Sequence, residues 1–235
     1  HDLSPAENKA VMILGSGPYC IGSSVEFDWC AVRTARTLKA LGETSIMINS
    51  NPETVSTDYD ESDRLYFEQL TFERVCDIAE FENLKGIVVS VGGQIANNLV
   101  VPLSKAGLPI LGTSPEMINN AEDRELFSTL LNDLNIDQPE WVAAHSLTKA
   151  KRFAAKVGYP VLIRPSYVLS GAAMNVVHSE AELEHYIQEA STVSKDHPVV
   201  ISDFISEAKE LEMDGVANEG NIEIYAISEH VENAG

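Results

Sequence analysis

The chain has 235 residues, of which 44% are hydrophobic and 22% charged, and its formal net charge is -20. The composition is that of an ordinary globular protein, and the length suits one large domain or two small ones. The acidic balance argues against a nucleic-acid partner, but it permits a local phosphate site built from arginine and backbone N–H groups. No stretch approaches the about 20 apolar residues that cross a bilayer, so no membrane partner is expected.

The first half of the chain alternates between strand and helix patterns. Residues 1–9 are polar, lack a signal-peptide pattern and are expected to form a linker. Short apolar runs predict strands at 11–14, 46–48 and 86–91, and helical spacing predicts helices at 31–41, 72–81 and 95–106. Strands separated by helices at this interval indicate βαβ units. We therefore predict a Rossmann-like α/β domain with a parallel sheet over residues 10–118.

A different pattern begins near residues 114–115. Two helix-like stretches and an amphipathic helix at 147–157 are followed by strand candidates at 160–163, 174–177, 199–205, 210–217 and 222–228, with one clear helix at 180–190. This order indicates an α+β domain with an antiparallel sheet. We place the boundary near residues 115–128 and expect the second domain to occupy residues 119–235. It looks incomplete at Gly235.

A glycine-rich segment, GSGPYCIG at residues 15–22, follows the first predicted strand. A dinucleotide-binding fingerprint would place its third glycine three residues after the second, whereas here it comes five residues later with a proline between. We favour a tight strand-to-helix turn over an NAD site. The chain has no Gly-Lys-Ser/Thr ending, which excludes a P-loop.

Several motifs resemble the C-terminal synthetase half of the carbamoyl-phosphate synthetase large chain. They are GSSVEFDWC (22–30), NPETVSTDYD (51–60), GGQ (92–94), GTSP (112–115), AEDR (121–124), RPSYVLSG (164–171) and SEHVENAG (228–235). They follow the family's order and spacing and cover nearly the whole chain. Their amino-acid sequences are similar to those of eukaryotic members.

The resemblance implies a pre-ATP-grasp domain followed by a partial ATP-grasp domain. The family makes carbamoyl phosphate from bicarbonate, ammonia and two ATP, and its C-terminal half phosphorylates carbamate. The implied cofactors are ATP and Mg²⁺ or Mn²⁺, with metal ligands beyond Gly235, so we expect no metal site in this chain. The implied partners are the N-terminal synthetase half and a glutaminase subunit or domain. The sequence leaves open whether the pathway served is arginine or urea synthesis, or pyrimidine synthesis.

The expected compartment is the cytoplasm, with the mitochondrion as the alternative. The three cysteines, Cys20, Cys30 and Cys76, are scattered and lack metal-ligand spacing, which is typical of a reducing compartment.

Two arginines are the leading candidates for phosphate contact. Arg164 ends an apolar strand and precedes Pro165, which places a permanently charged fork at a strand terminus. The resemblance implies that Arg164 binds ATP phosphate and is catalytic, and that Arg124 also contacts ATP. The alternatives are a surface arginine paired with a carboxylate for Arg164 and a helix-surface ion pair for Arg124.

The segment after Arg164 has the composition of a lid. Its hydroxyl groups and the hinge at Gly171 would let it fold over phosphates and exclude water, which decomposes carbamate and its phosphate. The resemblance assigns Ser170 and Gly171 to ATP binding. Related loops often carry two adjacent glycines, and Ser170 stands where the first would be.

The remaining candidates lie near the end of the chain. The resemblance implies that Asp203 and Ile205 meet the adenine through their main chain and that Glu210 accepts hydrogen bonds from the ribose. It also implies that Gly235 begins a segment that approaches ATP. Glu210 shares a period-2 face with two further carboxylates, a pattern that a solvated strand also produces. His230 has no second ligand at metal spacing, which argues against a metal there.

Two other functions stay open. One is another ATP-grasp carboxylate ligase, such as a biotin-carboxylase-like subunit, against which the motifs at 27–30 and 51–60 argue. The other is a non-catalytic nucleotide-binding module, because we expect the isolated fragment to be inactive without the metal-binding segment.

Overall fold

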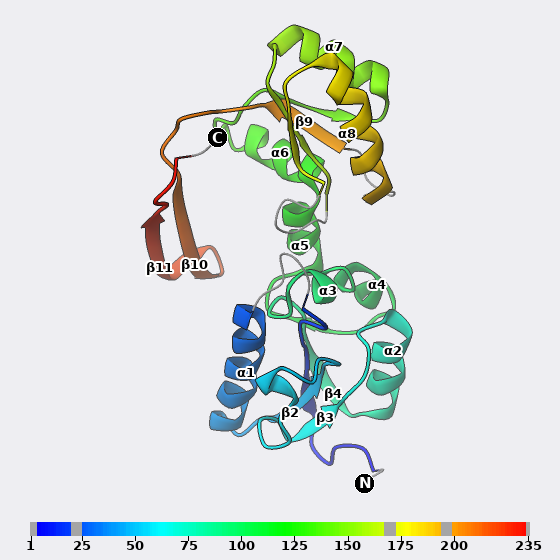
Figure 1. Ribbon diagram of the computed structural model, residues 1–235. Helices are drawn as coiled ribbons and strands as arrows, with labels where there is room; N and C mark the ends of the chain where they lie inside the picture. Colours follow the sequence, from blue (N-terminus) through cyan, green and yellow to red (C-terminus); the bar gives the residue numbers. More distant parts are fainter. Residues whose placement is uncertain (1–3, 20–24, 167–172, 194–198, 234–235) are drawn as a thin grey trace.

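The computed structural model describes residues 4–19, 25–166, 173–193 and 199–233, and its two lobes are joined by one helix (Figure 1). In the described part of the chain no helix is both long and apolar enough to cross a membrane.

The first lobe is a parallel five-stranded sheet in the order β3-β2-β1-β4-β5. Its strands are β1 (Ala10–Leu14), β2 (Thr44–Ile48), β3 (Arg64–Tyr66), β4 (Leu84–Val88) and β5 (Ile110–Leu111). Its helices are α1 (Val25–Ala40), the short η1 (Val55–Thr57), α2 (Phe72–Phe81), α3 (Gly93–Asn97) and α4 (Val100–Lys105). All five residues of β1 are buried, as expected for a strand covered on both faces.

Helices cover both faces of this sheet. On one face Ile13 and Met47 pack against Ala31 and Ala35 of α1. On the other face Met12, Leu14, Ile46 and Ile48 pack against residues of α2 and α4. The predicted α/β architecture is therefore confirmed for this lobe.

Three details of the first lobe differ from the prediction. The edge strands β3 and β5 were not expected, because they are only three and two residues long. Helix α1 begins at Val25, six residues before the predicted start. The predicted helix at 95–106 is two helices, since Pro102 has no N–H to donate to residue 98 and is tolerated only in the first turn of α4.

The second lobe is an antiparallel four-stranded sheet in the order β6-β9-β7-β8. Its strands are β6 (Trp141–Ala144), β7 (Val161–Arg164), β8 (Asn175–Val177) and β9 (Val199–Asp203), and its helices are α6 (Arg124–Asp133), α7 (Leu147–Val157) and α8 (Glu180–Val193). Helices α7 and α8 bury the face that carries Val161, Ile163, Val199 and Ile201. Helix α6 packs on β6 and β9. The predicted antiparallel sheet is confirmed, although β6 was not expected.

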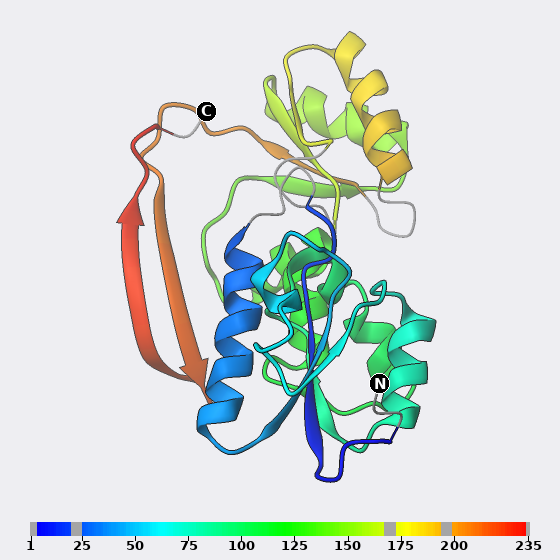
Figure 2. The same ribbon diagram turned by 60° about the horizontal axis from the view of Figure 1, so that its bottom comes forward.

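A two-stranded hairpin follows the second sheet. Strand β10 (Leu211–Asn218) pairs antiparallel with β11 (Asn221–Glu229). Every residue of both strands is exposed, and the hairpin extends away from the antiparallel sheet (Figures 1 and 2).

Helix α5 (Pro115–Glu122) joins the lobes (Figure 1). Its N-cap is Ser114, whose hydroxyl accepts the Met117 N–H at 3.3 Å, and its Ile118 is buried in the core of the first lobe. Asp123 ends α5 and caps α6, because its carboxylate accepts the N–H groups of Glu125 at 2.9 Å and Leu126 at 3.0 Å. Two helices thus meet at a single residue.

The edge of the first sheet carries a buried carboxylate. Glu82 accepts hydrogen bonds from the Ala6 N–H at 2.7 Å, the Tyr66 hydroxyl at 2.5 Å and Arg64 at 3.3 Å. Burial, then the hydrogen bond to Glu82 and its charge, raises the pKa of Tyr66 to about 12. The folded state therefore favours the neutral phenol.

Tyr66 should make folding stability depend on alkaline pH. Its stabilising contribution is complete below the ordinary tyrosine pKa near 10 and is lost as the pH rises through about 12. Urea unfolding between about pH 9 and 12 should therefore show a steeper loss of stability in the wild type than in Tyr66→Phe. Tyr59→Phe is the control, because Tyr59 is 90% exposed. Equal pH slopes for the wild type and Tyr66→Phe would contradict this role.

Candidate functional site

Arg164 lies at the end of β7, on the face of the antiparallel sheet opposite α7 and α8. Residues alternate between faces along a strand, so Val161 and Ile163 enter the core while Arg164 takes the other side. It stands opposite Val200 of β9, which is fully buried. The Arg164 Nε atom is itself buried and has no hydrogen-bond partner among the residues that the structure describes. A buried, unpaired guanidinium nitrogen is costly and indicates a missing acceptor.

Arg124 is held near Arg164 by a hydrogen bond from its own main chain to Ser166. Arg124 is the first residue of α6, and its N–H donates to the Ser166 hydroxyl at 2.9 Å. Ser166 is 1% exposed and lies two residues beyond Arg164. The end of β7 and the start of α6 are thereby fixed against each other.

The two guanidinium groups make a positive site. Burial, and then the charge of Arg124, lowers the pKa of Arg164 below its ordinary value. Within the described ranges neither arginine forms an ion pair with a carboxylate, so the surface ion pairs considered from the sequence are not seen there. Ser166 and Asp123 occupy the first N–H groups of α6, so among the described groups at this end of α6 the arginine side chains are the donors that remain. Two neighbouring guanidinium groups of this kind fit a phosphate group, whose oxygens accept their hydrogen bonds.

The structure places Asp203, Ile205 and Glu210 elsewhere. Asp203 ends β9, and its N–H already donates to the Glu140 carbonyl at 2.9 Å, so this N–H is not available to a ligand. Ile205 is 52% exposed on the segment leading to the hairpin. In the part of the chain that the structure describes, no hydrogen bond or ion pair joins these residues to the arginine pair.

Glu210 belongs to a cluster at the base of the hairpin. The Glu210 carbonyl accepts the His230 N–H at 3.0 Å, and its carboxylate lies 3.9 Å from His230 Nδ1. His230 Nε2 lies 3.0 Å from a Glu212 oxygen. The hydrogen bond to Glu212, followed by the charge of Glu210, raises the pKa of His230. The sequence did not predict this cluster, because it depends on the register of β10 and β11.

Three predicted ATP-binding residues, Ser170, Gly171 and Gly235, lie outside the described residues. In the described ranges no group of three histidine, cysteine or acidic side chains could hold a metal ion, and we assign no step to a metal.

The glycine-rich turn of the first lobe is held by protein groups. Gly17 has a φ of +68°, and its N–H donates to the Asn49 side chain at 3.0 Å. A side chain on Gly15 would lie 2.7 Å from Asn49. The Gly17 N–H is therefore not free for a pyrophosphate, which supports the prediction of a structural turn.

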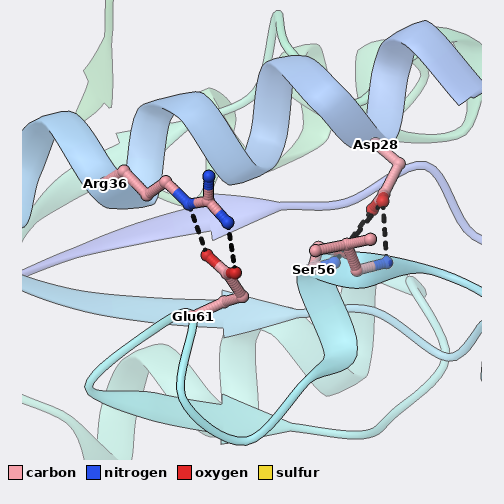
Figure 3. A network of polar contacts seen from close by, with 5 residues as sticks. Asp28, Arg36, Ser56 and Glu61 are labelled. Atoms are coloured by element: carbon pink, nitrogen blue, oxygen red, sulfur yellow. Dashed lines mark hydrogen bonds and ion pairs between the residues drawn. The ribbon is translucent and has the colours of Figure 1, made fainter.

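Two of the motifs quoted above pack against each other at α1 (Figure 3). The Asp28 carboxylate accepts the N–H groups of Val55 at 2.9 Å and Ser56 at 3.3 Å. Farther along α1, Arg36 pairs with both carboxylate oxygens of Glu61. A pocket of about 440 Å³ lies here, lined by Tyr19, Val25, Asp28, Trp29, Val32, Arg36, Glu53 and Val55.

Comparison with known families covers almost all of the chain. Residues 7–120 match the carbamoyl phosphate synthase preATP-grasp domain, and residues 123–232 match the carbamoyl-phosphate synthase L chain, ATP binding domain. The chain belongs to the carbamoyl-phosphate synthase large-chain family. The two matches meet where α5 gives way to α6, beside Arg124.

Individual carbamoyl-phosphate synthase relatives support the same family assignment. The chain is 61% identical over 228 residues to the carbamoyl phosphate synthase arginine-specific large chain of Cutaneotrichosporon cutaneum, covering 97% of this chain and 19% of that protein. It is 58% identical over 235 residues to the multifunctional protein ura1 of Schizosaccharomyces pombe, covering 100% of this chain and 10% of that protein. It is 56% identical to the mitochondrial carbamoyl-phosphate synthase [ammonia] of Rattus norvegicus, covering 100% of this chain and 16% of that protein. The chain therefore spans at most about a fifth of these relatives.

Solved structures confirm the ATP-grasp-like fold class of this carbamoyl-phosphate synthase segment. The biotin carboxylase domain of 2-oxoglutarate carboxylase from Hydrogenobacter thermophilus, in complex with MgADP, ADP and bicarbonate, matches with a TM-score of 0.65 at 19% identity, over 86% of this chain and 46% of that one. N5-carboxyaminoimidazole synthetase from Staphylococcus aureus complexed with ADP matches with a TM-score of 0.66 at 11% identity, over 99% and 58%. At these identities the likeness concerns the fold alone.

Proposed function

We propose that this chain forms the ATP site that phosphorylates carbamate to carbamoyl phosphate in a carbamoyl-phosphate synthase large chain. The observation that carries the proposal is the buried Nε of Arg164, which has no partner within the described ranges, beside the second guanidinium of Arg124. Two positive groups that pair with no carboxylate in the described part of the chain provide a site for the phosphates of ATP.

The proposed reaction needs little covalent chemistry from the protein. The bond between the γ-phosphorus and the β,γ-bridging oxygen breaks, a bond between phosphorus and a carbamate oxygen forms, and ADP leaves. Catalysis then depends on positioning and on neutralising charge, which Arg164 and Arg124 can supply. A bound Mg²⁺ or Mn²⁺ would add further neutralisation of the phosphates.

The assignment to the carbamate-phosphorylating half rests on the resemblance of the motifs, among them the residues around His230 and those packed at α1 (Figure 3). The identity of 56–61% to carbamoyl-phosphate synthases, against 11–19% to the carboxylase and synthetase structures, favours this reaction over that of another ATP-grasp ligase. The remaining synthetase half and a glutaminase are the proposed partners. Glu210, Asp203 and Ile205 stay proposed contacts for ribose and adenine, and Ser170, Gly171 and Gly235 stay proposed contacts for ATP.

The full large chain should synthesise ATP from carbamoyl phosphate and ADP, which is the reverse of the proposed step. Formation of ATP can be followed with a coupled luminescence assay, with a reaction lacking carbamoyl phosphate as the control. A full chain that binds ADP and forms no ATP would contradict the proposed function.

A further inference from the structure

Two amide side chains of the first lobe hold the last residue of α5. Gln94 Nε2 donates to one oxygen of the Glu122 carboxylate at 3.0 Å, and Asn97 Nδ2 donates to the other at 2.8 Å. Gln94 and Asn97 are three residues apart on α3 and therefore lie on the same face of that helix. We call these three residues the Glu122 clasp.

The clasp is maintained at a cost to both amides. The Gln94 Oε1 and Asn97 Oδ1 atoms are buried and find no hydrogen-bond partner among the described residues. An ionised carboxylate can only accept, so both NH₂ groups must face Glu122 and both carbonyl oxygens must turn away. Charge-assisted hydrogen bonds are about twice as strong as neutral ones, which explains why this orientation prevails.

The clasp is directly linked to the arginine pair through the chain. Glu122 ends α5, Asp123 caps both helices, and Arg124 begins α6. Consecutive Cα atoms are about 3.8 Å apart, so a displacement of Glu122 is passed to Arg124 within two residues. On its far side Arg124 is held by the Ser166 hydroxyl at the end of β7. Arg124 is thus anchored to the first lobe through Glu122 and to the second through Ser166.

This double anchoring addresses an electrostatic problem. Arg124 and Arg164 repel each other when no anion lies between them, and this repulsion adds to burial, the larger cause, in lowering the pKa of Arg164. Their approach must therefore be imposed by the surrounding structure, and Figure 1 shows α5 leading from the level of α3 and α4 up to α6. We infer that Gln94 and Asn97 are positioning residues for the phosphate site, acting through Glu122 on Arg124. This inference rests on the proposed function.

The test is the KM for ADP in ATP synthesis from carbamoyl phosphate by the full large chain. The variant Gln94→Leu/Asn97→Leu should raise this KM about two- to thirtyfold, the range of couplings carried through neighbouring residues. The milder Glu122→Gln, which keeps the volume and removes the charge, should raise it less and covers the case in which the double variant fails to fold. Asn98→Leu, an exposed neighbour on the same turn, is the matched control and should leave KM unchanged.

Combination with Arg124→Ala separates positioning from general destabilisation. If the clasp acts through Arg124, adding Gln94→Leu/Asn97→Leu to Arg124→Ala should raise KM no further than Arg124→Ala alone. Fully additive effects, or an unchanged KM in both the double variant and Glu122→Gln, would overturn the inference while leaving the proposed function intact. An Arg124→Ala variant with a wild-type KM would instead overturn the phosphate site itself.

Discussion

Arg164→Met should lower ATP synthesis from carbamoyl phosphate and ADP about a hundredfold or more in the full large chain. Preorganised donors aimed at developing charge are worth about 10² to 10³ in rate, and Arg164 is the member of the pair whose Nε atom is buried. Methionine fills a similar volume without the charge. Bicarbonate-dependent ATP hydrolysis, which the resemblance implies for the other synthetase half, should persist.

The same substitution should stabilise the nucleotide-free protein. Unfolding gives the Arg164 Nε a water partner that the folded state lacks, so the folded state bears a penalty of about 1–3 kcal/mol for that atom. Arg164→Met removes this penalty together with the repulsion from Arg124. We expect a higher unfolding midpoint without nucleotide and a smaller rise of the midpoint when ADP is added.

Arg152→Met is the matched control, since Arg152 is an exposed arginine of α7 in the same lobe. It should change neither activity nor the response to ADP. Full ATP synthesis by Arg164→Met would contradict the role of Arg164. Loss of bicarbonate-dependent hydrolysis with ATP synthesis retained would place this chain in the other half of the enzyme.

The parts of the fold that the sequence predicts well are those with local signals. Helix α2 has the predicted bounds, and its cap is Thr71, whose hydroxyl accepts the Arg74 N–H. Helix α7 also has the predicted bounds, between the cap Ser146 and Gly158, whose φ is +93°. The edge strands β3 and β5 of the first sheet escaped prediction because two or three partly exposed residues carry no periodicity.

The candidate site likewise combines residues that local sequence signals reveal with contacts that they do not reveal. Arg164 could be singled out because it ends an apolar strand before a proline, but its pairing with Arg124, 40 residues earlier, depends on the Ser166 hydroxyl. The Glu122 clasp and the His230 cluster join helices or strands whose relative placement is set by tertiary packing. No local pattern encodes such contacts, so they are visible only in three dimensions.

Gly92→Ala should strongly destabilise the first lobe, costing about 3 kcal/mol of folding free energy. Gly92 has a φ of -91°, which alanine adopts readily, so the effect is steric. A Cβ there would lie 2.5 Å from the carbonyl oxygens of Leu14 and Gly15 and 2.6 Å from the Ala96 Cβ. Backbone oxygens cannot rotate away as a flexible side chain can. The end of β1 or the whole of α3 must therefore move.

Gly42→Ala distinguishes this clash from a general intolerance of alanine. Gly42 follows α1 with a φ of +75° and open space around its Cα, so alanine there suffers only the conformational cost of about 1–2 kcal/mol. Urea unfolding of both variants measures the difference. Because α3 carries Gln94 and Asn97, Gly92→Ala should also raise the KM for ADP, whereas Gly42→Ala should not. Equal losses of stability in the two variants would show that β1 and α3 are packed more loosely than these distances require.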